Sequence, residues 1–359
     1  MDDTVILATS RDALEQKLAL LHRETKAISM EIHPRKSQYM VINSNDSRAF
    51  ILNHITIEHT KEYIYLGTPI IAASLQEQVR AHIELKRMHL MKFSSFLKKN
   101  ADAPFPVKEL VFKSAINSAV LYGCESWLCN DLKPAITPIL SAQKQLLAVR
   151  NQTCGDLVQA ELGYPGTVAM VKEAQIKFLQ KLTSRDGYAG CPAHFAINLA
   201  TQVGAKAGKY VNTLRGASGC FRTADLENLR SKISGSESSK KMKMTYHKFN
   251  FHLTSHRIYK NNVPEHLRIA FTRMRLGSHR LRIETGRWTR TPVEERLCIC
   301  GEIQTERHVL LHCPVSRPLR GQFPGLDFTN LGTLMDGTPV EVAKYCTTIL
   351  RNFEGERTG

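Results

Sequence analysis

Three cysteines and one histidine near the carboxyl end constrain the fold of this chain more than any other feature. Cys298 and Cys300 are separated by one residue, His308 follows after seven more, and Cys313 after another four. Thiolate and imidazole are the ligands that Zn²⁺ prefers in tetrahedral sites. The pattern predicts a turn at Gly301, a short helix that carries His308, and one zinc ion. Four protein ligands leave no open position, so we expect this zinc to be structural.

The sequence leaves the fourth ligand of this site open. His312 lies one helical turn after His308, so it can replace Cys313 or support the site from outside it. The Cys-x-Cys spacing is tighter than the usual two to four intervening residues. The alternative interpretation is that these are reduced cysteines and surface histidines, in a helix that ends before Pro314.

The charge of the chain predicts a polyanionic partner. Its 359 residues include 49 Lys and Arg against 33 Asp and Glu, a net charge of +16. Residues 240–320 contain 17 basic and 6 acidic residues, so they hold +11 of that surplus. RNA and DNA are the usual partners of such a chain. A basic protein without a polyanionic partner is the alternative.

Arginines and aromatic residues alternate within this basic region. Arginine presents a planar fork that pairs with phosphate through two hydrogen bonds. The candidates for phosphate contacts are four arginines: Arg280, Arg282, Arg287 and Arg290. Three aromatic residues could stack on exposed bases: Tyr246, Phe249 and Trp288. In the alternative interpretation the arginines form a solvated surface and the aromatic residues belong to the core.

Composition places the chain among globular proteins, at 42% hydrophobic and 23% charged residues. Its length allows two or three domains. No apolar run approaches the roughly 20 residues of a membrane span, and the acidic start does not suit a secretory signal. The nine cysteines are an odd number, which fits a reducing compartment. We expect an intracellular protein, nuclear or cytoplasmic, with no membrane partner.

Hydrophobic periodicity divides the first half of the chain into two parts. Residues 1–70 predict short strands around one helix that Ser10 caps. The expected elements are a strand at 4–8, a helix at 11–30, a strand at 39–42, a hairpin at 50–57 and a strand at 63–66. Helices follow at 74–99, 107–127, 133–150 and 168–182. Cys124 and Trp127 lie in this helical part, and we expect them to be core residues.

Five short motifs occur in an order that resembles the reverse transcriptases of non-LTR, LINE-type retrotransposons. The chain begins with Met1-Asp2-Asp3 and an apolar run, similar to the end of the aromatic-x-Asp-Asp box. His33-Pro34-Arg35-Lys36-Ser37 resembles the next palm motif, and Tyr63-Ile64-Tyr65-Leu66-Gly67 resembles the primer grip. The stretch from Leu121 to Trp127 resembles a thumb helix, and the Cys/His segment resembles a zinc knuckle.

The resemblance implies an α+β fold with five parts. Residues 1–70 would form a partial palm, with a βαβ unit and a hairpin, and residues 71–185 a mainly helical thumb and its extension. A linker would follow at 186–245. The basic region with the zinc-knuckle-like motif would occupy 246–325, and a C-terminal tail 326–359. The aromatic residue before Asp-Asp is absent, as are the upstream palm aspartate and the fingers. We therefore expect the chain to be the C-terminal part of a longer polymerase.

The resemblance also implies roles for residues of the first part. Asp2 would bind Mg²⁺ and Asp3 would support it, but only in a complete parent polymerase. Lys36 would lie near the incoming nucleotide, and Tyr65, Leu66 and Gly67 would lie against the primer backbone. The alternatives are a solvated terminus, a solvated loop lysine and an ordinary strand end.

The resemblance implies a fragment of an RNA-directed DNA polymerase that binds nucleic acid and is inactive alone. The alternatives are a non-catalytic, zinc-dependent nucleic-acid-binding protein derived from such an element, and a decayed reading frame.

Overall fold

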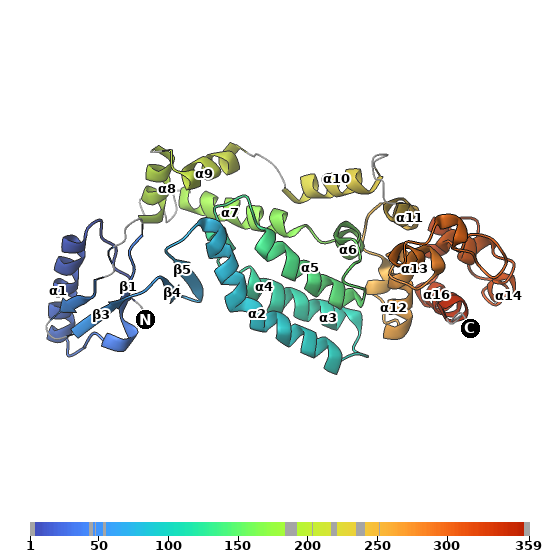
Figure 1. The fold of residues 1–359 in the computed structure, drawn as a ribbon, viewed down its shortest axis with the longest axis horizontal. Helices are drawn as coiled ribbons and strands as arrows, with labels where there is room; N and C mark the ends of the chain where they lie inside the picture. The colour runs from blue at the N-terminus through green and yellow to red at the C-terminus, as the bar shows by residue number, and fades with distance from the viewer. Residues whose placement is uncertain are drawn as a thin grey trace. The chain divides into compact units, whose positions relative to one another are not determined.

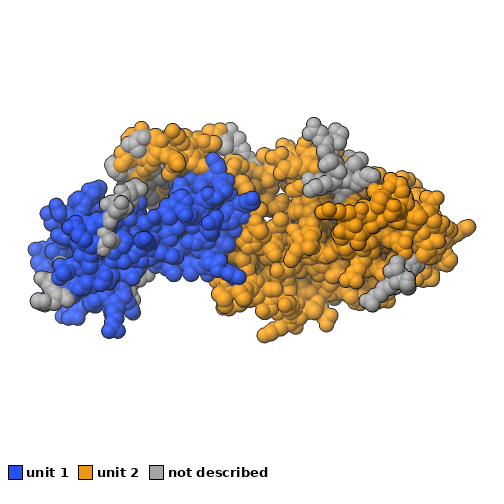
Figure 2. Space-filling view, in the orientation of Figure 1, with its two compact units in different colours: residues 1–87, 126–134 blue, residues 88–125, 135–359 orange. Residues whose placement is uncertain are grey.

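The fold is described from a computed structural model of the chain. It describes residues 4–42, 46, 48–52, 55–183, 192–202, 204–216, 221–234, 241–250 and 252–354. Asp2, Asp3 and the expected hairpin turn at 53–54 lie outside the described residues. The chain divides into two compact units, which are Met1–Arg87 with Ser126–Pro134 and Met88–Glu125 with Ala135–Gly359 (Figure 2).

The first unit contains a helix and a small mixed sheet (Figure 1). Helix α1 (Arg11–Ala27) begins where the Ser10 side chain accepts a hydrogen bond from the Ala13 N–H, as the sequence predicted. The strands of the sheet are β1 (Gln38–Tyr39), β2 (Phe50–Leu52) and β3 (Ile55–His59). Their order is β1-β3-β2, with β1 parallel and β2 antiparallel to β3. Tyr39, Phe50 and Ile57 form its core.

Two strand predictions for this unit need correction. Residues 4–8 belong to no strand, and Val5 and Leu7 are exposed. An apolar run becomes a strand only when its backbone groups find a partner, and no described strand pairs with this one. The strand expected at 39–42 shortens to Gln38–Tyr39 because its parallel pairing with β3 covers only two residues.

A second hairpin follows in the same unit. Strand β4 (Glu62–Tyr65) corresponds to the strand predicted at 63–66. It pairs antiparallel with β5 (Thr68–Ile71), a strand that the sequence did not predict. Leu66 and Gly67 form its two-residue turn, with φ of +48° and +74°. Both residues are left-handed, which is the backbone that a tight hairpin turn requires.

Helices form most of the second unit. Helix α2 (Leu75–Lys99), whose residues up to Arg87 belong to the first unit, confirms the long helix predicted at 74–99. Helix α3 (Phe105–Val111) continues through a π-helical stretch at Phe112–Asn117 into α4 (Ser118–Val120). Helices α5 (Lys133–Leu147), α6 (Gly155–Leu162) and α7 (Thr167–Thr183) follow. Cys124 of the second unit and Trp127 of the first are buried, as expected for core residues.

Nine further helices are described after α7. Three of them lie in the expected linker region: α8 (Pro192–Gln202), α9 (Lys206–Gly216) and α10 (Phe221–Ser234). After them come α11 (Lys241–Phe249), α12 (Glu265–Arg275), α13 (Arg282–Trp288), α14 (Arg317–Arg320), α15 (Leu331–Met335) and α16 (Pro339–Glu354). No described helix is both long enough and apolar enough to cross a lipid bilayer.

Helix α12 is the centre of the C-terminal part. It packs along α16 (Figure 1), and it carries two buried arginines, Arg268 and Arg275. Arg275 donates through Nε and Nη2 to the two carboxylate oxygens of Glu161 in α6, at 2.9 Å each. Arg268 makes the equivalent double contact with Glu265, at 2.7 Å. Buried charges need such partners. The Arg268–Glu265 pair lies within α12, whereas the Arg275–Glu161 pair ties α12 to α6.

Candidate metal centre

The first half of the Cys/His cluster is a tight turn. Leu297 and Ile303 pair as an antiparallel bridge, and the N–H of Cys298 donates to the Glu302 carbonyl at 2.7 Å. Within the turn the N–H of Gly301 donates to the Cys298 carbonyl at 2.9 Å, and Gly301 has φ of +93°. A Cβ at Gly301 would meet no atom within 4 Å. The turn therefore requires glycine for its backbone conformation and not for space.

The second half is a short π-helix, His308–His312, with Cys313 directly after it. The N–H of Cys313 donates to the His308 carbonyl at 2.7 Å, a bond that spans five residues. Residues five apart point to different sides of an α-helix, whereas the wider π-turn brings Cys313 round toward His308. The buried side chains of Val309, Leu310 and Leu311 hold this turn in the core.

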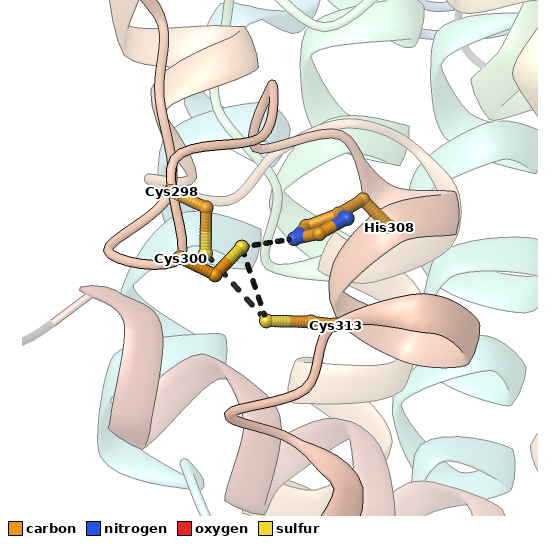
Figure 3. Close-up of side chains that lie close together, drawn as sticks. All are labelled: Cys298, Cys300, His308 and Cys313. Carbon is orange, nitrogen blue, oxygen red and sulfur yellow. Dashed lines mark hydrogen bonds between the residues drawn. The ribbon is translucent and has the colours of Figure 1, made fainter.

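All four predicted ligands point toward one another (Figure 3). Their ligand atoms lie within 4.8 Å of one another. The Sγ atom of Cys313 is 3.7 Å from that of Cys298 and 3.8 Å from that of Cys300, and Cys300 Sγ is 3.1 Å from His308 Nε2. With metal–sulfur bonds of about 2.3 Å, the sulfur–sulfur edge of a tetrahedral site is about 3.8 Å. The cluster therefore has the dimensions to hold a metal ion.

The structure chooses between the two candidates for the fourth ligand. Cys313 is buried and belongs to the cluster, whereas His312 is exposed and lies outside it. The sequence placed Cys313 in the site and kept His312, one helical turn after His308, as its possible replacement.

Burial sets the proton affinity of the ligand groups. It raises the pKa of the Cys298 thiol to about 12, and it lowers the pKa of His308 below its usual value. His308 is therefore neutral at pH 7, as a ligand must be. A cation would favour the Cys298 thiolate, which burial alone disfavours.

Polar side chains hold the backbone around the cluster. The Cys313 carbonyl accepts hydrogen bonds from Ser316 Oγ and from Arg320 Nη2, both at 3.1 Å. Tyr345 Oη donates to the Leu310 carbonyl at 2.6 Å. Groups in this position orient metal ligands and affect how tightly the site binds.

The four arginines predicted to contact phosphate differ in their exposure. Arg280 and Arg290 are exposed, and Arg282 is partly buried. Arg287 is also partly buried, and its Nη1 donates to Glu284 at 2.5 Å. The two exposed residues remain open to a ligand, whereas part of the charge of Arg287 is already paired.

Of the three aromatic residues proposed to stack on bases, one is exposed enough to do so. Tyr246 and Phe249 are buried, with 0% and 4% exposure. Tyr246 Oη donates to Glu161 at 2.8 Å. Trp288 is 51% exposed. The base-stacking interpretation is therefore wrong for Tyr246 and Phe249, because their rings form the core around α12.

In the first unit, the predicted residues occupy two turns. Lys36 is exposed in the 3₁₀ turn Pro34–Lys36, before β1. Leu66 and Gly67 form the exposed turn between β4 and β5, and Tyr65 is the last residue of β4. The carboxylates Asp2 and Asp3 lie outside the described residues.

Two features of the second unit were missed from the sequence. One is Glu161, whose only signal is an acidic residue within an apolar helix, Gly155–Leu162. The other is Arg150, whose guanidinium lies over the Trp288 ring, 3.9 Å from its centroid. No sequence pattern joins residues that lie so far apart along the chain.

Comparison with known proteins identifies no relative. No protein-family model matches the chain, and neither the curated proteins nor the solved structures contain a significant match.

Proposed function

We propose that the chain is a nucleic-acid-binding protein whose C-terminal part is stabilised by one structural Zn²⁺. The observation that carries this proposal is the convergence of Cys298, Cys300, His308 and Cys313. Three sulfurs and one imidazole, with their ligand atoms within 4.8 Å of one another, suit zinc better than a hard cation such as Mg²⁺ or Ca²⁺. A bound zinc would supply a cross-link between the turn at Gly301 and the π-helix.

The nucleic-acid part of the proposal rests on charge. The chain has a net charge of +16, of which residues 240–320 hold +11. Several of these arginines form buried pairs, such as Arg268 and Arg275. Others are exposed, among them Arg273, Arg280 and Arg290. Exposed cations that lack a carboxylate partner favour a polyanion.

The order of the five sequence motifs supports a relation to the C-terminal part of a LINE-type reverse transcriptase. A small mixed sheet followed by a helical region is compatible with that relation. A polymerase needs carboxylates from more than one segment to hold its two metal ions. We therefore expect these 359 residues, tested by themselves, not to extend a primer on RNA with Mg²⁺. Robust extension that Asp2→Asn abolishes would contradict this.

Salt dependence of binding tests the nucleic-acid function. Each phosphate contact on a single strand contributes roughly −0.7 to the slope of log K against log salt. We expect a slope of roughly −4 for the wild-type chain, from about six contacts. Replacing four arginines by glutamine should reduce its magnitude by up to about 3. The four are Arg280, Arg282, Arg287 and Arg290.

A variant of equal charge provides the control. It replaces four exposed cations elsewhere, which are Arg23, Lys26, Lys61 and Lys92. Its slope should stay close to that of the wild type if the basic region supplies the contacts. Binding that is indifferent to salt would contradict nucleic-acid binding through phosphates. An equal reduction of the salt slope in both variants would show that net charge alone determines the binding.

A further inference from the structure

The second unit has an exposed tryptophan, Trp288, and an arginine covers one face of its ring. Trp288 is the last residue of α13 and is 51% exposed, whereas Trp127, the other tryptophan of the chain, is 1% exposed. The guanidinium of Arg150 lies over its ring, with 3.9 Å between the Arg150 Cζ atom and the ring centroid. Since Arg150 covers one face and half of the residue is exposed, we take the other face of the ring to be the open one.

Arg150 is itself held in place. Its Nη2 donates to the Gly277 carbonyl at 2.9 Å, and its backbone N–H donates to Ser278 Oγ at 3.0 Å. These contacts fix the guanidinium beneath the indole ring. A ring held in this way loses little further side-chain freedom when a ligand stacks on it.

Two further arginines, Arg273 and Arg280, act electrostatically on Arg150. Arg273 is exposed, and its Nε donates to the Ala148 carbonyl at 3.0 Å. Arg280 is exposed, and its backbone N–H donates to Glu354 at 2.5 Å. Arg290 is exposed two residues after Trp288.

The charges near Arg150 do not balance. Partial burial lowers its pKa; Glu284 and Glu354 oppose that effect, and Arg273 and Arg280 add to it. Glu284 also pairs with Arg287. Two carboxylates, Glu284 and Glu354, therefore stand against four arginines, an arrangement that favours an anion at this surface. The four are Arg150, Arg273, Arg280 and Arg287.

We infer that the open face of Trp288, together with Arg273 and Arg280, binds a single strand of nucleic acid through a stacked base and its neighbouring phosphates. This inference rests on the proposed nucleic-acid binding and specifies the class of ligand. An aromatic face among cations is the arrangement with which proteins bind single strands. The bases of a duplex are stacked on one another inside the helix, so they cannot lie flat on Trp288.

Tryptophan fluorescence gives the direct test. The full chain is titrated with a 12-nucleotide oligo(dT) or oligo(U), and with heparin as a polyanion that has no bases. Both oligonucleotides should quench the exposed Trp288 emission, and heparin should not. The quenching should be absent in Trp288→Phe. Equal quenching by heparin would overturn the stacking contact.

Affinity is measured separately, by anisotropy of a labelled oligonucleotide. Stacking of one base contributes about 1–3 kcal/mol, so Trp288→Ala should weaken single-strand binding roughly 5- to 150-fold. Trp288→Phe should retain most of the affinity because it keeps a ring. Arg273→Gln with Arg280→Gln should reduce the salt slope by about 1.4. Binding of a 12-base-pair duplex should change little in Trp288→Ala.

Matched variants separate this site from general effects. Tyr122→Ala removes an aromatic residue of similar exposure, 52%, and Arg317→Gln removes an exposed cation. Neither should change affinity more than twofold. If the wild type binds oligo(dT) but Trp288→Ala binds equally well, the site is wrong and the proposed function stands. If the wild type binds no nucleic acid, the proposed function fails as well.

Discussion

At the scale of single residues, the second unit depends on buried charges that are fully paired. Glu161 is completely buried and accepts four hydrogen bonds, two from Arg275 and one each from Tyr246 and Tyr259. Burial raises the pKa of Glu161, but Arg275 and the two hydroxyls more than offset it, so the pKa lies below its usual value. Glu161 is therefore charged in the folded protein.

Replacing Glu161 by glutamine is expected to destabilise the protein strongly. The substitution keeps the shape of the side chain but leaves the Arg275 cation buried without its counter-ion. Loss of one partner of a buried pair costs about 3–5 kcal/mol. Urea unfolding at pH 7 measures the effect. Glu84→Gln is the control, because its pair with Arg87 is exposed and should contribute less than about 1 kcal/mol. Similar losses in the two variants would contradict this account.

His256 is expected to make stability depend on pH. Its Nε2–H donates to the Met335 carbonyl at 2.9 Å, and its Nδ1 accepts from the Ile258 N–H at 3.1 Å, so the neutral ring is satisfied. Burial lowers its pKa to about 4, and Arg275 acts in the same direction. The unfolded chain, with an ordinary pKa of about 6.5, takes up the proton first as pH falls. Stability from this group is complete above about pH 6.5 and declines toward pH 4.

The size of this pH effect is at most about 3 kcal/mol. Unfolding curves of the wild type and of His256→Gln at several pH values test it. The difference between the two free energies of unfolding should shrink as pH falls from 6.5 to 4. His266→Gln replaces an exposed histidine, and its free energy of unfolding should change with pH in the same way as that of the wild type. A constant difference for His256→Gln would refute the proposed titration.

At the scale of elements, periodicity predicted the long helices and failed where the backbone departs from regular geometry. The helices at 74–99 and 168–182 have a 3.6-residue pattern, and α2 and α7 match them closely. Neither π-helical stretch was predicted, because the wider turn leaves no pattern of its own. Strand β5 was missed because it contains Pro69, and proline weakens a strand pattern in the sequence, although a two-stranded sheet has edges that tolerate proline.

The turn at Gly301 is expected to be sensitive to its backbone conformation. Gly301 and Gly216 both have open space where a Cβ would lie, but only Gly301 has a positive φ, of +93°. Gly301→Ala should therefore strain the Cys-x-Cys turn and weaken zinc binding, measured by competition with a chromogenic chelator. Gly216→Ala should leave zinc affinity unchanged. If both variants bind zinc like the wild type, the turn does not position the cysteines.

At the scale of the whole molecule, the sequence predicted chemistry within short segments better than contacts between distant ones. The four cluster residues lie within sixteen positions, so their spacing was enough to find them. The choice of Cys313 over His312 needed the π-turn. The pairs Glu161–Arg275 and Arg150–Trp288 join residues more than 100 positions apart, and only packing of the second unit brings them together.

The basic residues show the same limit of prediction from the sequence. The sequence located the basic region, but it could not separate the buried arginines of α12 from exposed ones such as Arg280 and Arg290. Burial distributes these residues between two roles, one in the core and one at the surface. A count of charges is therefore an upper bound on the contacts available to a nucleic acid.

The metal content of the purified chain tests the central claim most directly. Prepared under reducing conditions, the wild type should contain one zinc per chain by mass spectrometry of the element. Cys300→Ser and His308→Ala should lower this content, whereas His312→Ala should retain it, because His312 lies outside the cluster. A zinc-free wild type in which the three thiols and the imidazole all react freely with modifying reagents would contradict the account.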